Sequence, residues 1–198
     1  MLMVSPVERA QAPLLAQPYY TKGDPGPIAT ALAYVPEMLE VALPFIGRIL
    51  GASSIDVRTK ELVIVRTSAV MGCRYCTETH AAGALDAGLQ VEEVRSLCDV
   101  SRPVCEFDDP GETALLAWVE AVALGPGDVP VEVACEFARR FDEPDIVELT
   151  LLVAATLMLN RFCTVLGLPT GEASLARLAE AGLSLSVARA APSAVEPR

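Results

Sequence analysis

Two cysteines and the only histidine of this 198-residue chain stand close together in the segment GCRYCTETH. Cys73 and Cys76 are three positions apart, and His80 follows Cys76 by four. On a helix these side chains share one side, because residues three and four apart are surface neighbours. Two thiols at this spacing can form a disulfide, and a helix N-terminus favours the thiolate through its unpaired amides and its dipole. The segment therefore predicts a redox-active dithiol with one nucleophilic cysteine.

His80 and Glu61 are the residues that can move a proton near these thiols. An imidazole one turn beyond Cys76 can accept the thiol proton directly or through a water. Glu61 lies on the apolar segment VRTKELVIVR, where burial raises a carboxyl pKa and a nearby imidazole lowers it. We expect Glu61 to pair with His80 and to orient and polarise the imidazole. In the alternative interpretation, His80 has no chemical role and Glu61 is solvated, paired with Arg58 or Lys60.

The other aromatic and sulfur side chains give weaker signals. Tyr75, between the two cysteines, is a candidate neighbour of the thiols, and with Trp118 it can line a substrate pocket, although aromatic residues are more often plain packing. The remaining cysteines lack any comparable spacing, and buried free cysteine usually behaves as a small apolar residue. We assign no role to Cys98, Cys105, Cys135 and Cys163, and we place Cys163 in the core.

Zinc is the main chemical competitor, because Cys73, Cys76 and His80 are all possible ligands. The chain offers no second CxxC or HxxxH pair, so a closed site would need Glu61 or a distant cysteine as its fourth ligand. We expect no metal and no cofactor. A thioredoxin-like protein also uses CxxC, but within alternating strands and helices that this sequence lacks.

The composition excludes several classes of partner. Lys and Arg total 15 against 26 Asp and Glu, a net charge of −11, and no basic stripe is present. We therefore expect neither a nucleic-acid partner nor a membrane partner. The N-terminus does not have the pattern of a signal peptide, and the most apolar stretch, Leu149 to Leu159, is about half of the roughly 20 residues that span a bilayer. Free thiols in a cytoplasmic protein are expected.

The hydrophobic pattern predicts an all-α protein of about six to eight helices, with no convincing strand. Prolines and glycines crowd residues 1–27, which we interpret as an extended arm. Residues 28–168 form the predicted helical domain, and residues 169–198 a C-terminal helix with a mobile tail. Ser54 or Asp56 is expected to cap the helix that carries Glu61, and Gly72 to separate it from the helix that begins near the cysteines.

The segment KELVIVRTSAVMGCRYCTETH resembles the signature of the carboxymuconolactone decarboxylase superfamily, in its alkylhydroperoxidase D-like (AhpD-like) branch. That signature is a glutamate, eleven residues, CxxC, three residues and a histidine, filled here by Glu61, Cys73, Cys76 and His80. The resemblance covers about residues 35 to 168 and implies an all-helical fold that assembles as a homotrimer or homohexamer. It also implies peroxidase or disulfide-reductase activity.

Under this resemblance each signature residue has an implied role. Cys76 corresponds to the peroxidatic cysteine, which becomes a sulfenic acid, and Cys73 to the resolving cysteine and proton donor. His80 and Glu61 correspond to a proton relay, and an external thiol reductant restores the dithiol. One position departs from the best-known members, which carry a histidine where this chain has Tyr75. The proton relay and the thiol reductant can therefore differ from those of these members.

Three alternatives stay open beside a hydroperoxide substrate. A decarboxylase-type lyase would act on a lactone without needing both cysteines. A redox sensor would change its oligomer packing on oxidation with negligible turnover. A zinc-binding helical module would use the same residues as ligands.

Overall fold

The computed structural model describes residues 2–101, 107–125 and 128–185, which form nine α-helices, two short 3-10 helices and no strand within those ranges. The predicted all-α fold is confirmed, with one helix more than the upper expectation. The elements are η1 (Arg9–Gln11), η2 (Gln17–Tyr20), α1 (Pro27–Leu32), α2 (Pro36–Leu50), α3 (Val57–Val70), α4 (Arg74–Asp86), α5 (Val91–Cys98), α6 (Pro110–Leu124), α7 (Val131–Ala138), α8 (Glu143–Leu166) and α9 (Glu172–Glu180).

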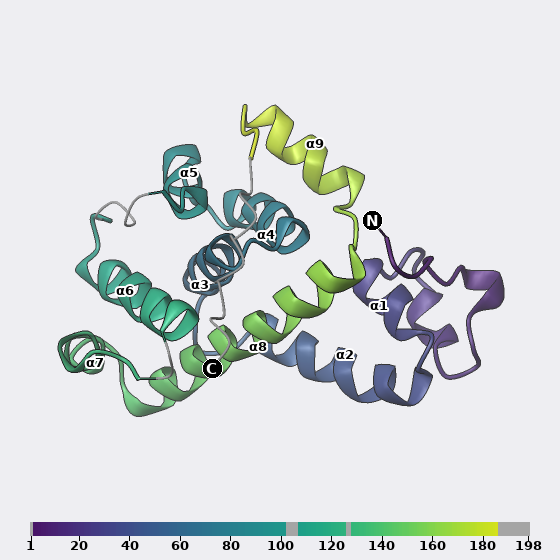
Figure 1. The fold of residues 1–198 in the computed structure, drawn as a ribbon, viewed down its shortest axis with the longest axis horizontal. Coiled ribbons are helices and arrows are strands. Elements are labelled where there is room, and N and C mark those ends of the chain that lie inside the picture. Colours follow the sequence, from purple (N-terminus) through teal and green to yellow (C-terminus); the bar gives the residue numbers. More distant parts are fainter. Residues whose placement is uncertain (1, 102–106, 126–127, 186–198) are drawn as a thin grey trace, which may run out of the picture.

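Helix α3 is the centre of the fold and packs against α4, α5, α6 and α8 (Figure 1). Its residues 62–69 are all buried, which agrees with apolar side chains placed nearly all the way round the helix. Asp56, one of the two predicted caps, accepts a hydrogen bond from the amide of Thr59. Gly72, at φ 66°, then turns the chain into α4. The two helices that carry the candidate site residues are therefore packed directly against each other.

Two buried basic side chains fasten α3 to its neighbours. The Lys60 ammonium donates to the carbonyl oxygens of Ile49 (3.0 Å) and Gly51 (2.7 Å) and pairs with Glu148 on α8. Arg66 pairs with Glu120 on α6. Because both cations are almost fully buried, their partners hold the ends of α3 at fixed positions.

Helix α8 is long and apolar enough to cross a membrane by length and composition. In this structure it packs against α2, α3, α4 and α6 and buries the polar side chains of Thr156 and Asn160. Asn160 accepts a hydrogen bond from Ser68 at 3.1 Å. These contacts make α8 a helix of the folded core, as the sequence predicted.

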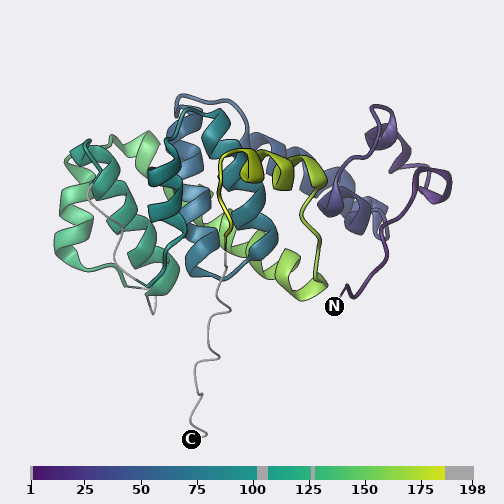
Figure 2. The same cartoon turned by 90° about the horizontal axis from the view of Figure 1, so that it is seen from above.

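The segment before α1, predicted as an extended arm, is folded rather than extended. It contains η1 and η2, and the buried Tyr20 donates its hydroxyl to the carbonyl of Val7 at 2.7 Å. Prolines exclude a long helix here but permit short turns, and the apolar residues between them pack against Ala33 and Leu39. Figure 2 shows this segment at one end of the molecule, beside α1 and α2.

At the other end of the chain, α9 forms as predicted and packs against α4. Cys105 and the predicted mobile tail beyond residue 185 lie outside the described residues. The amide of Met3 donates to the carbonyl of Leu166, so the N-terminal segment and the end of α8 lie side by side.

Candidate functional site

Cys73 and Cys76 meet at the N-terminus of α4. Cys73 is the N-cap residue, and its Sγ accepts a hydrogen bond from the amide of Cys76 at 3.3 Å. Both side chains are buried, with Cys73 fully inaccessible and Cys76 at 5% exposure. An N-cap position faces the unpaired amides of the first turn, so a negative charge on Cys73 is stabilised there.

A third cysteine, Cys163 of α8, joins this pair. It is 1% exposed and belongs to the same buried cluster as both CxxC cysteines, together with Ala31 and Leu168. All three cysteines are therefore buried together where α8 meets the start of α4. The sequence predicted only that Cys163 lies in the core, because nothing in its local pattern indicates that α8 crosses the start of α4.

Hydrogen bonding within this cluster separates the three thiols in acidity. Hydrogen bonds from the thiols of Cys163 and Cys76 lower the pKa of Cys73 far below its ordinary value. The same contacts, together with burial, raise the pKa of Cys76. The pKa of Cys163 rises to about 12, because it hydrogen-bonds with Cys73 and is buried. Cys73 is therefore the more acidic of the two CxxC thiols, and Cys76 needs a base to ionise.

Glu61 and His80 are in direct contact across the α3–α4 interface. Glu61 Oε2 lies 3.0 Å from Nδ1 of His80, and both side chains are partly buried. A Cβ added at Gly83, one turn after His80, would lie 3.0 Å from the other carboxylate oxygen of Glu61. Because Gly83 has no side chain, the Glu61 carboxylate can lie directly against α4. The competing partners of Glu61 are engaged elsewhere, because Arg58 pairs with Glu93 and Glu112 and Lys60 pairs with Glu148.

The two aromatic candidates lie in different places. Tyr75 packs against the thiol cluster, and its pKa is raised by burial and by the neighbouring sulfurs. Trp118 instead belongs to a separate cluster, where it stacks on Phe137 with ring centroids 4.5 Å apart. Of the two candidates, Tyr75 therefore lies beside the thiols, and Trp118 is a packing residue.

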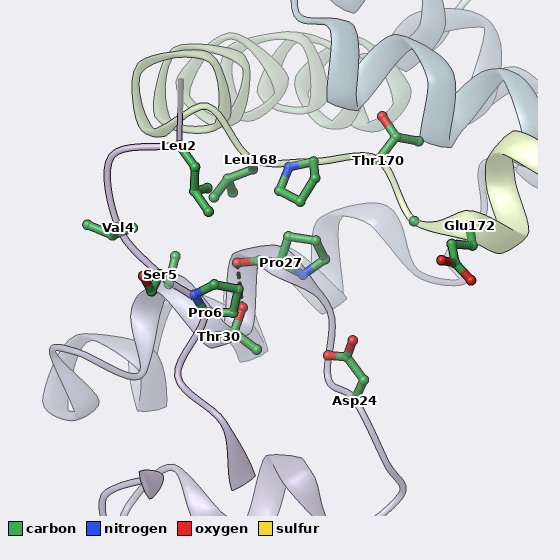
Figure 3. A pocket seen from close by; sticks show the side chains of 13 residues that line it. Leu2, Val4, Ser5, Pro6, Asp24, Pro27, Thr30, Leu168, Thr170 and Glu172 are labelled. Carbon is green, nitrogen blue, oxygen red and sulfur yellow. Dashed lines mark hydrogen bonds between the residues drawn. The ribbon is translucent and has the colours of Figure 1, made fainter.

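A hollow of about 460 Å³ lies next to the thiol cluster. It is formed by the N-terminal residues, the start of α1 and the link between α8 and α9 (Figure 3). Ala31 and Leu168 line it and also belong to the buried cluster that holds the three cysteines. Thr170, another lining residue, donates to the buried carboxylate of Glu78 on α4, which fixes the link against the thiol helix. The hollow and the thiol cluster thus share the side chains of Ala31 and Leu168.

The side chains that suggested zinc do not form a metal-binding group. Within the described ranges, no cluster of three or more His, Cys, Asp or Glu side chains is placed to hold a metal ion. Nδ1 of His80 is paired with Glu61, and the three cysteines lie together in one buried cluster. These contacts are those of a thiol centre beside a carboxylate–imidazole pair.

Comparison with known proteins agrees with this arrangement. The sequence profile of the Carboxymuconolactone decarboxylase family matches residues 36–121, the part that contains α2 to α5 and most of α6. The protein YdfG of Bacillus subtilis (strain 168) is 32% identical over 116 residues, which are 58% of this chain and 78% of YdfG. The chain belongs to the carboxymuconolactone decarboxylase family. The protein MT2376 of Mycobacterium tuberculosis (strain CDC 1551 / Oshkosh) is also 32% identical over 108 residues, but these are only 36% of its length.

Solved structures share the fold over most of the chain. One is the alkylhydroperoxidase AhpD core protein from Ralstonia eutropha JMP134, a peroxidase-related protein. It aligns with a TM-score of 0.71 at 15% sequence identity, and the alignment covers 86% of this chain and 96% of the Ralstonia chain. The debrominase Bmp8 aligns with a TM-score of 0.72 at 22% sequence identity, and the alignment covers 90% of this chain and 97% of the Bmp8 chain. The fold is therefore AhpD-like, and relatives that share it include enzymes with different substrates.

Proposed function

We propose that this protein is a thiol-dependent peroxidase that reduces a hydroperoxide through a dithiol–disulfide cycle of Cys73 and Cys76. The observation that carries the proposal is the geometry at the start of α4, where the Cys73 sulfur accepts the Cys76 amide at a helix N-terminus and both cysteines belong to one buried cluster. His80, which is paired with Glu61 of α3, lies one turn further along the same helix. A two-electron reduction needs a dithiol that can close and a group that can accept a proton, and these residues supply both.

The cycle has three steps. Cys76 loses its proton to His80, attacks the terminal oxygen of the hydroperoxide and becomes a sulfenic acid while the alcohol leaves. Cys73 then attacks the sulfenic sulfur, the disulfide forms and water is released. An external thiol reductant, through exchange, returns the disulfide to the dithiol. Glu61 orients the imidazole and stabilises its protonated form.

Cys76 is assigned the attacking role because it is the more exposed of the two sulfurs, at 5% against 0% for Cys73. The hydrogen bond of His80 goes to Glu61 rather than to a thiol, so a water is assigned as the bridge between the imidazole and Cys76. The substrate reaches the sulfur from the hollow that Ala31 and Leu168 share with the thiol cluster. We place this chemistry in the cytoplasm, where thiols stay reduced.

A homotrimer or homohexamer completes the proposal. The outer face of α8 exposes a stripe of apolar side chains, and the outer face of the adjacent α2 does the same. Apolar faces of this kind are typical of subunit interfaces. The stripe residues are Val147, Leu151, Met158 and Val165 on α8, and Met38, Val41 and Phe45 on α2.

The decisive test mixes the fully reduced protein with an organic hydroperoxide in a stopped-flow instrument and counts free thiols before and after. The expected result is the loss of two thiols for each peroxide consumed. Cys76→Ser should abolish consumption, whereas Cys73→Ser should consume one equivalent and stop at a sulfenic acid that dimedone traps. If the thiol count does not change, the peroxidase proposal is wrong, and lactone turnover that survives replacement of both cysteines would favour the lyase.

A second candidate is reductive dehalogenation by the same dithiol. The crystal structure of the C82A variant of the debrominase Bmp8 contains 2,3,4-tribromopyrrole. Its alignment with this protein covers 91% of this chain and 100% of the Bmp8 chain. A thiol pair can supply the two electrons for replacing bromine by hydrogen, with release of bromide and formation of a disulfide. Bromide release from a bromopyrrole, at a rate above that with hydroperoxide, would favour this candidate.

A further inference from the structure

The hollow beside the thiol cluster has an apolar end and an acidic end. Val4, Ala31 and Leu168 line it and also pack in the buried cluster that holds the cysteines. In Figure 3 the side chains of Val4 and Leu168 lie to the left of the view, and those of Asp24 and Glu172 to the right. The two carboxylates therefore lie at the end of the hollow that is farther from the sulfurs.

The segments that form the hollow flank the part of the chain that defines the family. Its lining residues fall within 2–31 and 168–172, whereas the family profile matches residues 36–121. The dithiol and the carboxylate–imidazole pair are family features, but the walls of the hollow are supplied by the N-terminal segment and the link between α8 and α9. The chemical character of the hollow is therefore a property of this chain rather than of the shared signature.

The charge around the hollow is negative. Asp24 and Glu172 are exposed carboxylates, and the described lining residues include no Lys, Arg or His. Oδ1 of Asp24 accepts a hydrogen bond from the amide of Gly26 at 2.9 Å, which orients this carboxylate. A ligand in the hollow thus meets two negative charges with no lining cation to compensate them.

The two threonine hydroxyls of the hollow act as acceptors toward a ligand. Thr30 donates its proton to the carbonyl of Pro27, and Thr170 donates its proton to the buried carboxylate of Glu78. A hydroxyl whose proton is already used can only accept a further hydrogen bond. Together with the two carboxylates, these hydroxyls complement a group that donates hydrogen bonds or carries a positive charge.

We propose that this hollow is the binding subsite for the organic group of the hydroperoxide, and that Asp24 and Glu172 are specificity-determining residues that favour a positively charged group on the substrate and disfavour a carboxylate. The proposal deepens the peroxidase assignment and rests on it for the reaction at the sulfurs. A substrate whose hydroperoxide group points toward the thiols at the apolar end extends its organic group toward the two carboxylates.

The size of the effect follows from Coulomb's law for solvent-exposed charges. At a separation of roughly 10 Å in water, one pair of unit charges changes a binding constant by a factor of about two. With two carboxylates, a cationic and an anionic ligand of the same shape should differ by about fivefold to fifteenfold at low salt. At about 0.5 M salt the Debye length falls to about 4 Å, and the ratio should fall to between about one and two.

The test measures binding of three unreactive alcohols to the reduced protein by NMR titration at low and high salt. They are 2-phenyl-2-propanol, its para-aminomethyl derivative and its para-carboxylate, which are the products that the corresponding cumene hydroperoxides would give. We expect the cationic alcohol to bind most tightly and the carboxylate most weakly. The three hydroperoxides should follow the same order in kcat/KM, and high salt should remove most of the difference.

The double variant Asp24→Asn with Glu172→Gln should abolish this order while keeping the shape of the hollow. An asparagine side chain can still accept the amide of Gly26. The matched control is Glu8→Gln with Glu180→Gln, which removes the same two charges from exposed positions of the N-terminal segment and α9 that do not line the hollow. The control should keep the order of the wild type, because the total charge of the two double variants is equal.

Three results would overturn the proposal: no measurable binding of any of the alcohols, equal binding of the cationic and anionic alcohols at low salt, or an unchanged order in the Asp24→Asn/Glu172→Gln variant. If the alcohols bind in the expected order but no hydroperoxide is consumed, the subsite stands and the peroxidase proposal fails. If hydroperoxides are consumed without any dependence on charge, the peroxidase proposal stands and this inference fails.

Discussion

A methyl group added at Gly83 would test whether the contact between Glu61 and His80 serves the chemistry. The new Cβ would lie 3.0 Å from Oε1 of Glu61 and 3.4 Å from its carboxyl carbon. Ordinary contacts begin near 3.4 Å, so the carboxylate must retreat from α4 by about 0.4 Å. His80 lies on the same helix, and its bond to Glu61 would lengthen from 3.0 Å to about 3.4 Å, beyond a good hydrogen bond.

The same Gly83→Ala substitution should make the folded state more stable, although it weakens the contact between Glu61 and His80. Replacing glycine by alanine inside a helix usually stabilises the folded state by about 0.5–1 kcal/mol. Gly47 provides the matched control, because it lies inside α2 with no atom within 4 Å of an added Cβ. Gly47→Ala should raise Tm by about 1–4 °C without changing turnover. Gly83→Ala should gain less, because part of the stabilisation is offset by the displaced carboxylate.

The assay is peroxide consumption by the reduced enzyme, measured as kcat/KM, with thermal unfolding followed by circular dichroism. We expect Gly83→Ala to lose about tenfold in kcat/KM, a fraction of what full loss of general base catalysis costs. In a Glu61→Ala background the same substitution should have no further effect, since both act through one contact. A Gly83→Ala variant that gains as much Tm as Gly47→Ala and keeps full activity would refute this reasoning.

Three further outcomes follow from contacts elsewhere in the fold. Replacing Leu151 and Met158 by glutamate should dissociate the proposed oligomer into monomers in light scattering, because both side chains are exposed on the outer face of α8; an unchanged mass would remove that face as the interface. Lys60→Met should lower the free energy of unfolding in urea by about 2–4 kcal/mol, since the carbonyls of Ile49 and Gly51 would lose their donor; a stability equal to wild type would contradict this. Burial raises the pKa of Cys98 to about 12 from an ordinary 9.0, so its protonated form favours the folded state and stability is lost as pH rises from about 9 to about 12. Cys98→Ala should flatten that alkaline loss in unfolding titrations.

Local sequence patterns were sufficient to predict the helices around the candidate site. Asp56 and Gly72 mark the ends of α3 by capping chemistry and by positive φ, and both effects are set by residues next to each other in the chain. The spacing of Cys73, Cys76 and His80 needs only the helical period to place them on one side. The pairing of Glu61 with His80 was harder to predict, because two basic neighbours on its own helix were equally available as partners.

Contacts between distant segments could not be predicted in the same way. The place of Cys163 depends on α8 crossing the start of α4, and the apolar pattern of α8 is compatible with many crossings. The prediction of an extended N-terminal arm was wrong for a related reason. The prolines of this segment correctly exclude a long helix, but the burial of Tyr20 depends on the surface that α2 presents to it. Propensity constrains the local backbone, whereas tertiary packing decides which side chains meet.

The asymmetry between the two CxxC sulfurs also has a consequence for how the disulfide is reopened. Thiol exchange proceeds fastest when the departing sulfur is the better-stabilised thiolate, and here that sulfur is Cys73, at the N-cap with its surrounding donors. The incoming thiol should therefore attack Cys76, which is also the more exposed of the pair. One sulfur would meet both the oxidant and the reductant from outside, while its buried partner closes and releases the disulfide. A helix N-terminus suits that division, because its fixed amides stabilise the charge on Cys73 each time the disulfide opens.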